Sequence, residues 1–475
     1  MTMEILSLLL TITGYMIIAY MLVVGGIYLI LFFMSMPKIR REHGLDRDEP
    51  IEELTESEDT YPVSVLVPAY NEELGVVSTV RSLLALKYPE FEIIVINDGS
   101  KDKTNEKMLT SFNMEKVNSP IRQHFPTADV NHVYRSRTHQ NVWLLEKENG
   151  GKADALNAGI NFSRYPYFAA IDGDSILERD ALLKTMKPII DSNGGVTCTG
   201  GTVRIANGSE IRRSVVEKIA LPKQPLAIMQ IVEYFRAFLI GRLGLSRVNV
   251  LLIISGAFGV FEKQRVIRAG GYETKTIGED MELIVRLHKM LKDEKSTQRI
   301  EYIQDPVCWT EAPSDVKSLK SQRIRWQKGL AQTLWRHKKM MFNPKYKGIG
   351  LFSMPYYFFV ELLSSVFEFL GYFIIIAGLV FGLVNPEVTT LMIIVTILYG
   401  SLLSALAVLL EEWTYHKYRD MKSILVLYFW ALTESFWFRP FMVWCRVVGL
   451  FSVMKKKQTW GDMKRKGIEE EQKGA

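Results

Sequence analysis

The sequence predicts an α/β domain with a mostly parallel, Rossmann-like sheet, inserted between transmembrane helices of an integral membrane protein. Three observations predict it. Residues 5–34 are apolar and uncharged, residues 62–340 alternate short apolar runs with helical patterns, and long apolar runs return at about residue 350. A run like the first exceeds the roughly 20 apolar residues that span a bilayer. Strands that alternate with helices favour right-handed crossovers and a parallel sheet.

The first element is an N-terminal transmembrane helix, expected over residues 1–36. No small-residue cleavage site follows it, so it is predicted to be retained rather than removed as a signal peptide. Lys38, Arg40 and Arg41 come next, and the positive-inside rule places the chain beyond them in the cytosol. The acidic stretch over residues 37–61 is expected to be a loose linker.

The second element is the α/β domain, expected over residues 62–315. Its strands are predicted at 63–70, 91–100, 141–148 and 167–175, and each ends in turn-forming or acidic residues. In open parallel sheets, ligands bind at the carboxyl ends of the strands. This rule selects five polar residues as candidates for a site: Glu72, Asp98, Lys152, Asp172 and Asp174.

Each of these candidates has a structural alternative. Asp172 and Asp174 of "IDGD" suit Mg²⁺ or Mn²⁺ on a diphosphate, but the same letters often form a plain turn. Asp98 of "NDGS" either caps a strand-to-helix turn or accepts from a nucleotide. Lys152 follows two glycines at a helix start, where it either meets phosphate or stays solvated.

The segment "TIGEDMELIVRLHK" begins a helix with Glu279 and Asp280 in its first turn. Acids are favoured there by the helix dipole. Alternatively, Asp280 is a general base that takes the proton of a sugar hydroxyl. The seven histidines have no zinc-ligand spacing, the three cysteines form no CxxC pair, and the net charge of +6 gives no indication of nucleic-acid binding.

Interfacial helices are expected over residues 316–348, which contain "QRIRW". By default, such a turn sends its arginines toward lipid headgroups and its tryptophan into the aromatic belt. The C-terminal transmembrane helices are expected over residues 349–454, where runs 351–384 and 389–410 each suffice to cross.

A third apolar region, residues 423–454, contains Glu434, Arg439 and Pro440 in its middle, which is costly in hydrocarbon. We therefore expect a hairpin or re-entrant pair broken near Pro440. This arrangement returns the basic tail, residues 455–475, to the cytosol.

Taken in order, six motifs resemble those of the processive family 2 glycosyltransferases of the GT-A fold: "PAYNE", "NDGS", "GGKADALNAG", "IDGD", "GED" and "QRIRW". This family includes bacterial poly-N-acetylglucosamine, cellulose and hyaluronan synthases, and the resemblance covers residues 62–340. It implies a plasma-membrane enzyme with a cytosolic catalytic domain. Such an enzyme uses a UDP-sugar, UDP-N-acetylglucosamine or UDP-glucose, to elongate a β-linked extracellular polysaccharide by inversion and to translocate it.

The resemblance also implies roles for the matching residues of the α/β domain. Glu72 and Asp98 would bind the uridine, and Lys152 would approach the diphosphate. Asp172 and Asp174 match an Asp-x-Asp that binds nucleotide and divalent metal, either Mg²⁺ or Mn²⁺.

Asp280 matches the catalytic base of a Thr-Glu-Asp motif, beside Glu279 at the acceptor. Gly278 stands where threonine is usual, which puts a role for that hydroxyl in doubt.

The "QRIRW" segment matches the family's Gln-x-x-Arg-Trp. Arg325 is expected to contact the diphosphate, while Gln322 and Trp326 would lie at the acceptor end of a channel. Arg323, which the motif leaves free, is expected to anchor to lipid.

In the tail, Trp460 and Gly461 of "TWGDM" look like a gating segment of hyaluronan synthases, although the following Thr-Arg is missing.

Two other functions remain open from the sequence. A glycosyltransferase that adds one sugar to a membrane lipid would share the fold, but its relatives generally lack "QRIRW". A non-enzymatic sensor or transporter would not need six polar motifs. The expected partners of a synthase are the UDP-sugar, the growing polysaccharide, the lipid bilayer and a small accessory membrane subunit.

Overall fold

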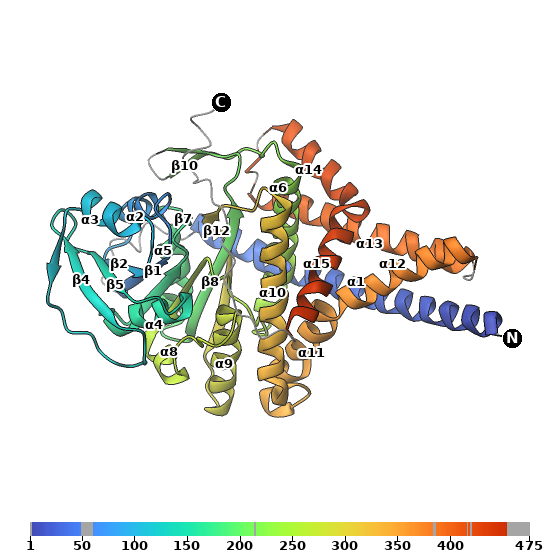
Figure 1. Ribbon diagram of the computed structural model, residues 1–475, viewed down its shortest axis with the longest axis horizontal. Coiled ribbons are helices and arrows are strands. Elements are labelled where there is room, and N and C mark those ends of the chain that lie inside the picture. Colours follow the sequence, from blue (N-terminus) through green and yellow to red (C-terminus); the bar gives the residue numbers. More distant parts are fainter. Residues whose placement is uncertain are drawn as a thin grey trace. The chain divides into compact units, whose positions relative to one another are not determined.

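The computed structural model describes residues 2–48, 60–212, 215–382, 386–415, 417–418 and 420–453. The chain divides into two compact units, each assembled from separate stretches of sequence (Figure 1). The helical unit comprises Met1–Lys38, Lys223–Leu245 and Pro313–Gly461. The described part of the sheet unit lies within Ile39–Pro222 and Ser246–Ala312.

The sheet unit contains a ten-stranded sheet in the order β3-β4-β5-β2-β1-β6-β11-β8-β12-β7. The strands are β1 Val63–Ala69, β2 Phe91–Asp98, β3 Met114–Val117, β4 Val130–Ser136, β5 Val142–Lys147, β6 Tyr167–Ile171, β7 Ile176–Leu177, β8 Val196–Ile205, β11 Phe258–Glu262 and β12 Arg299–Thr310. The pairings give one direction to all strands except β4, β7 and β11. The predicted mostly parallel sheet is confirmed.

The centre of the sheet consists of β5, β2, β1 and β6, all parallel. Val65 of β1 pairs with Ile93 on one side and with Ala169 on the other. Parallel strands that are covered on both faces need apolar residues at successive positions. This is why "VSVLVPA" and "FEIIVIND" are nearly continuous apolar runs rather than alternating ones.

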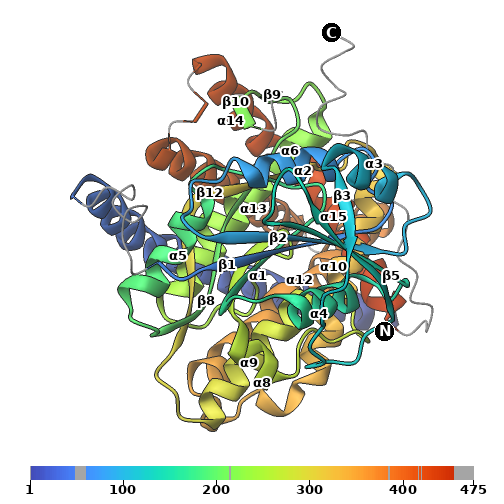
Figure 2. The same ribbon diagram turned by 90° about the vertical axis from the view of Figure 1, so that its left-hand side faces the viewer.

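Helices cover both faces of this sheet (Figure 2). They are α2 Val76–Leu84, α3 Thr104–Ser111, α4 Lys152–Phe162, α5 Ala181–Asp191, α8 Lys263–Ala269 and α9 Glu279–Asp293. Leu156 of α4 and Leu283 of α9 belong to one hydrophobic cluster with Leu66 of β1. The two helices therefore lie on the same face, with α2 and α3 on the other.

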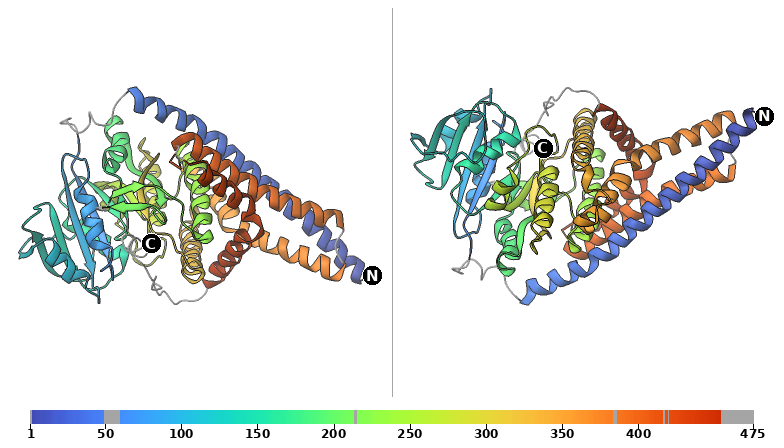
Figure 3. Two further views of the ribbon diagram at one scale, coloured as in Figure 1. Left: turned by 90° about the horizontal axis from the view of Figure 1, so that it is seen from above. Right: turned by 90° about the horizontal axis from the view of Figure 1, so that it is seen from below.

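The helical unit contains three segments that are long and apolar enough to cross a membrane: Ser7–Pro37, Ile349–Ala377 and Pro386–Tyr415. They belong to α1 (Thr2–Asp48), to a region that ends in α12 (Ser364–Phe381) and to α13 (Pro386–Tyr415). Figure 3 shows α1 running beside α12 and α13. Ile17 and Met21 of α1 pack against Ile374 and Met392.

Helix α1 is longer than the sequence suggested. It continues through Pro37 to Asp48, so the first part of the expected linker at 37–61 is helical. Residues 38–48 contain three Arg and one each of Leu, Glu and Lys, all of which are good helix formers. Residues 49–59 of that linker lie outside the described part of the chain.

The third apolar region forms two helices, α14 (Met421–Thr433) and α15 (Phe438–Ser452), each shorter than the roughly 20 residues of a full crossing. A short 3₁₀ turn, Glu434–Phe436, and Trp437 separate them. Pro440 lies in the first turn of α15, where its missing N–H leaves no helical bond unmade. The break thus comes just before the proline.

The charges in this region are paired inside the helical unit. Glu434 accepts from Arg236 at 2.9 and 3.0 Å, and Arg439 donates to both carboxylate oxygens of Glu368 at 2.8 Å. Paired charges that face the protein interior are the form in which ionisable groups are tolerated at membrane depth. Because its two charges are paired, the segment "ESFWFRP" can lie between the apolar helices α14 and α15 at membrane depth.

Candidate active site

The predicted residues of the α/β domain lie together at the carboxyl edge of the parallel strands. Glu72 follows β1, Asp98 ends β2, Lys152 opens α4 after β5, and Asp172 and Asp174 follow β6. The first turn of α9 adds Glu279 and Asp280. All seven belong to the sheet unit.

The turn between Asp172 and Asp174 is packed tightly against the end of β1. A Cβ atom at Gly173 would lie 3.1 Å from the carbonyl oxygen of Pro68 and 3.4 Å from Cγ of Glu72. Thr79 holds the turn by donating to the carbonyl of Gly173 at 2.9 Å. A side chain at this position would have to push back the end of β1, and Glu72 lies directly beside the turn.

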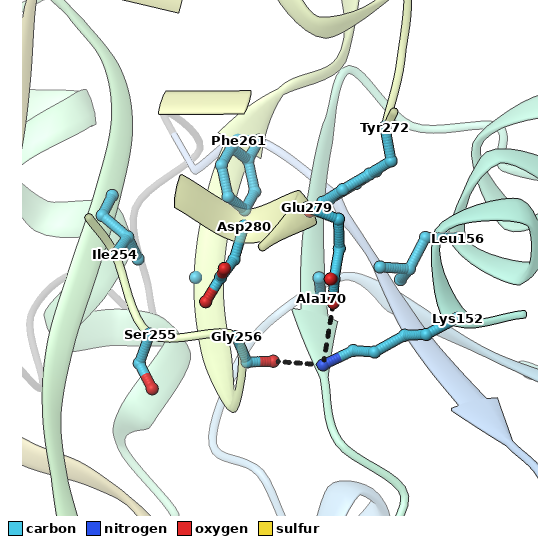
Figure 4. A pocket seen from close by; sticks show the side chains of 11 residues that line it. Lys152, Leu156, Ala170, Ile254, Ser255, Gly256, Phe261, Tyr272, Glu279 and Asp280 are labelled. Atoms are coloured by element: carbon cyan, nitrogen blue, oxygen red, sulfur yellow. Dashed lines mark hydrogen bonds and ion pairs between the residues drawn. The ribbon is translucent and has the colours of Figure 1, made fainter. Parts of the chain in front are cut away.

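Lys152 is the cation of a pocket in the sheet unit (Figure 4). Its Nζ lies 2.5 Å from Oδ1 of Asp172 and 3.8 Å from Oε1 of Glu279, and it donates to the carbonyl of Gly256 at 3.1 Å. Leu156, Ala170, Ile254, Ser255, Gly259, Phe261 and Tyr272 complete the lining with Asp280. The ammonium group thus joins three elements that are distant in sequence.

Gly256 separates the cation from the candidate base. A Cβ atom built on it would lie 3.1 Å from Oδ2 of Asp280 and 3.3 Å from Nζ of Lys152. The Asp280 carboxylate and the Lys152 ammonium therefore approach the same point of the backbone from two helices. Any larger residue at 256 would displace one of them.

Burial and charge set the ionisation of this group. Burial opposes the charged form of Lys152, but the adjacent carboxylates of Asp172 and Glu279 outweigh it and raise the pKa of Lys152 above its usual value. Burial also raises the pKa of Glu279 to about 7, against the opposing charge of Lys152 and with the support of Asp280. The pocket therefore keeps a fixed positive charge beside a carboxyl that titrates near neutrality.

Asp172 and Asp174 are the residues that suit a divalent metal. The described residues contain no group of three or more His, Cys, Asp or Glu side chains that could hold an ion by themselves. Two carboxylates on one turn supply only part of an octahedral shell. Mg²⁺ commonly takes one or two carboxylates and completes its shell with substrate phosphates and water. The donor set therefore fits a metal that arrives with a nucleotide diphosphate.

Asp98 is held by the protein itself. Its side chain is 4 % exposed, and it accepts from Lys147 at 2.6 Å, from the backbone of Gly150 at 3.0 Å and from that of Gly151 at 2.7 Å. Lys147 is fully buried and also contacts Asp154 at 2.7 Å. Uridine binding by Asp98 remains a prediction. The contacts show that Asp98 fixes the glycine turn from which Lys152 projects.

Two residues that the sequence analysis did not select connect α4 to α9. Asn157 of α4 donates to the carbonyl of Tyr272 at 2.9 Å and accepts from its N–H at 2.7 Å. Arg286 of α9 donates to the carbonyl of Gly271 at 2.7 Å and to Glu282. The turn at 270–272 is thus held from both sides. Asn157 lies inside the motif "GGKADALNAG". Its position in that motif is the sequence signal that could have identified it.

The "QRIRW" segment lies in α10 (Val316–Arg336) of the helical unit. Gln322 is nearly buried, while Trp326 is half exposed. The helix begins at Asp315, whose side chain accepts from the N–H of Ser318 at 2.9 Å. The contacts within the helical unit do not test a role in donor or acceptor binding, so the roles of Gln322, Arg325 and Trp326 stay predictions.

Arg323 is not a lipid anchor, contrary to expectation. Its side chain is 3 % exposed and donates to Glu233 of α6 (Pro225–Phe235) at 2.7 Å. Its guanidinium lies 4.2 Å from the centre of the Trp326 ring. The sequence could not show that a glutamate 90 positions earlier meets this face of α10. Trp460 and Gly461, the expected gating pair, lie outside the described residues.

Comparison with known families explains this arrangement. Residues 64–242 match the family model described as glycosyl transferase family 2. This stretch contains β1 to β8 and therefore Glu72, Asp98, Lys152, Asp172 and Asp174 of the candidate site. Residues 274–474 match a second model, described as chitin synthase.

Among curated proteins, the chain is similar to poly-β-1,6-N-acetyl-D-glucosamine synthases. It is 30% identical to that of Staphylococcus aureus (strain COL) over 322 residues, which cover 66% of this chain and 63% of the relative. The match to the Staphylococcus epidermidis protein is also 30% identical and covers 58% and 56%. The aligned region thus spans less than two thirds of these relatives.

Among solved structures, the chain resembles a mannosyltransferase from Pyrobaculum calidifontis determined with GDP-Man and Mn²⁺. The TM-score is 0.52 at 18% identity, over 89% of this chain and 99% of that one. The likeness establishes the fold, and the GT-A fold expected from the six motifs is confirmed.

Proposed function

We propose that the protein is a membrane-embedded inverting glycosyltransferase that elongates a β-linked polysaccharide from UDP-N-acetylglucosamine and passes it across the membrane. The observation that carries this proposal is the pocket in which Lys152 and Asp280 approach Gly256 from two helices of a family 2 domain. The sequence left N-acetylglucosamine and glucose open. The similarity to the staphylococcal poly-β-1,6-N-acetyl-D-glucosamine synthases favours the former.

The chemistry requires one displacement. The acceptor hydroxyl oxygen forms a bond to the anomeric carbon while the bond from that carbon to the diphosphate oxygen breaks. Asp280 takes the hydroxyl proton, and the electron pair of the broken bond leaves with UDP. Attack from the face opposite the leaving group inverts the configuration, so no carboxylate nucleophile is needed.

Lys152 supports the departure of the diphosphate. Its raised pKa keeps the ammonium charged, and it is already oriented by Asp172 and by the carbonyl of Gly256. A fixed charge aimed at developing negative charge needs no reorganisation during the reaction. Mg²⁺ or Mn²⁺ on Asp172 and Asp174 would add to this neutralisation, as the Mn²⁺ of the similar mannosyltransferase suggests.

Other residues bind the donor and the acceptor. Glu72, which lies against Gly173, would contact the uridine. Glu279 would orient the acceptor hydroxyl. Arg325 would pair with the diphosphate through its planar fork. Gln322 and Trp326 would contact the acceptor at the channel entrance.

The membrane arrangement follows the charge pattern. We place residues 62–315 in the cytosol, where UDP-sugars are made, and the three candidate spans in the plasma membrane. The growing polysaccharide and the bilayer are then partners of the helical unit. Trp460 and Gly461 would gate the polymer, and an accessory membrane subunit would control it.

The proposal is tested in membranes that contain the full chain, supplied with labelled UDP-N-acetylglucosamine or UDP-glucose and either Mg²⁺ or Mn²⁺. We expect a polymer from the first donor. Asp280→Asn should abolish it while UDP binding persists. Asp293→Asn is the control because it removes an exposed carboxylate from the other end of α9.

A labelled lipid that carries a single sugar would replace this proposal with lipid glycosylation. Full polymer synthesis by Asp280→Asn would remove the assigned base. If the wild-type chain produced no polymer and released no UDP, the proposed enzymatic activity would be overturned altogether.

A further inference from the structure

The end of α10 leads into a strongly basic and exposed stretch of the helical unit. Between Val316 and Val360 the chain contains no Asp or Glu. We call residues 335–352 the basic loop. Its exposed cationic side chains are Arg336, Lys338, Lys339, Lys345 and Lys347. The loop therefore presents one sign of charge.

The basic loop is built rather than loose. Phe342 donates its N–H to the carbonyl of Gly350 at 2.9 Å, and Met340 donates to the carbonyl of His337 at 2.8 Å. The side chain of Asn343 accepts from the N–H of Lys345 at 3.0 Å. A Cβ atom at Gly350 would lie 2.4 Å from the carbonyl oxygen of Asn343, so only glycine closes the loop.

Phe342 is held outward by this geometry. Its φ is +58°, a left-handed conformation that is uncommon for a bulky residue. Its side chain is nevertheless 60% exposed, and its nearest aromatic partner, Phe359, is 6.4 Å away between ring centres and itself 42% exposed. Backbone strain that presents an apolar ring to the outside points to a function for that ring.

Further apolar side chains are exposed in the basic loop. Trp335 is 72% exposed, Leu351 52% and Phe352 42%. Lys338 lies 4.1 Å from the centre of the Trp335 ring, so a charge and an indole are held together. Aromatic rings interleaved with lysines are typical of segments at the membrane–water interface, where the rings enter the lipid and the charges meet headgroups.

The position of the basic loop identifies what covers it. The candidate span Ile349–Ala377 begins inside the loop, and Figure 1 shows α10 and α11 (Met354–Tyr356) side by side at the start of that span. A soluble anion would match the lysines but would leave Phe342 and Trp335 in water. A bilayer surface with negative headgroups matches both.

We propose that the basic loop docks on anionic phospholipid headgroups. The ring of Phe342 enters the boundary between headgroups and acyl chains, and the lysines of the loop contact the phosphates. The loop selects negatively charged lipid at the cytosolic entrance of the Ile349–Ala377 span. This proposal rests on the membrane embedding proposed above and not on the sugar that is transferred.

The test uses the full chain in nanodiscs of phosphatidylcholine alone or mixed with phosphatidylglycerol. Melting temperature and the enrichment of phosphatidylglycerol around the protein are measured at low and high salt. We expect a higher melting temperature with the anionic lipid, a several-fold enrichment, and loss of both at high salt because the attraction is screened.

Replacement of the four loop lysines, Lys338, Lys339, Lys345 and Lys347, by Gln should abolish the enrichment. Phe342→Gly should weaken it and leave the melting temperature in phosphatidylcholine unchanged or higher, because glycine adopts a positive φ without strain. The control replaces four exposed lysines of the sheet unit, Lys87, Lys116, Lys218 and Lys289, by Gln.

Absence of enrichment in the wild-type chain would overturn the proposal. So would an equal loss in the control variant, or complete competition by inorganic phosphate, which would assign the lysines to a soluble anion. None of these measurements involves UDP-sugar, so they stay informative even if the proposed synthesis is wrong.

Discussion

Replacement of Asn157 by Ala tests whether its side chain sets the geometry of the pocket as well as the stability of the sheet unit. Asn157 is 3% exposed and makes a two-bond clamp on the backbone of Tyr272, which lines the pocket. Asn157→Ala leaves the N–H and the carbonyl of Tyr272 without these partners. Tyr272 and the turn before α9 should then move relative to Lys152.

The size of the effect follows from the two backbone groups. A buried polar group left unpaired costs roughly 1–3 kcal/mol, so Asn157→Ala should lower the free energy of unfolding by about 2–6 kcal/mol, a large part of the roughly 5–15 kcal/mol of an ordinary domain. A shift of about 1 Å in a catalytic group can cost roughly 100-fold in rate. We therefore expect kcat/KM to fall by roughly 10- to 100-fold.

A matched control is available one turn later on the same helix. Asn161 is also 3% exposed and clamps the backbone of Phe125, with its Oδ1 accepting at 3.1 Å and its Nδ2 donating at 2.9 Å. Asn161→Ala removes a comparable clamp together with a third bond, in which the N–H of His124 donates to Oδ1 at 3.0 Å, and neither His124 nor Phe125 lines the pocket. The assay compares melting temperatures and initial rates of UDP release for both variants at a temperature where each is folded.

We expect similar melting temperatures for the two variants and a rate deficit confined to Asn157→Ala. Equal rate deficits would mean that both act only through stability. A normal rate in a destabilised Asn157→Ala would refute the idea that this clamp sets the geometry between α4 and α9.

Three further predictions concern charged groups. Arg323→Gln should destabilise the helical unit by about 3–5 kcal/mol because it leaves Glu233 buried and unpaired, and Glu233→Gln in the same chain should recover much of this; additive melting shifts would contradict the pairing. Since burial raises the pKa of Glu279 to about 7, its protonated form contributes stability at low pH that is lost as pH rises toward 7. For the wild type, we therefore expect the melting temperature to fall as pH rises from 4.5 to about 7. Glu279→Gln should make this fall shallower, and an equally steep fall in the variant would count against the raised pKa. Lys152→Met should raise the KM for the UDP-sugar roughly 10- to 100-fold through loss of a charged hydrogen bond, and an unchanged KM in a folded variant would exclude its contact with the diphosphate.

The α/β domain could be predicted well from the sequence because its signals are local. Buried parallel strands need continuous apolar runs, and their polar ends coincide with one edge of the sheet. Glu72, Lys152, Asp172 and Asp174 could therefore be placed in one region from strand ends alone. The glycine between Asp172 and Asp174 and the helix start at Glu279 have local causes as well.

The remaining features depend on partners distant in the chain. Asp98 is covered by Lys147, which follows it by 49 positions, and Arg323 is neutralised by Glu233 of another helix. A polar side chain looks the same in sequence whether it faces a ligand, lipid or an internal partner. The continuation of α1 beyond Pro37 was missed for a related reason, since charge suggested a linker where helix propensity prevailed.

The ion pair between Glu368 and Arg439 also constrains how the polypeptide is made. Glu368 belongs to an apolar segment that leaves the ribosome 71 residues before its arginine does. Until α15 has been synthesised, that side chain has to remain near the membrane surface or be held by the insertion machinery. During biogenesis, α12 can therefore reach its final position in the helical unit only after α15 has been synthesised and Arg439 has paired with Glu368. Truncation before Arg439 should therefore give a chain that is poorly inserted as well as inactive.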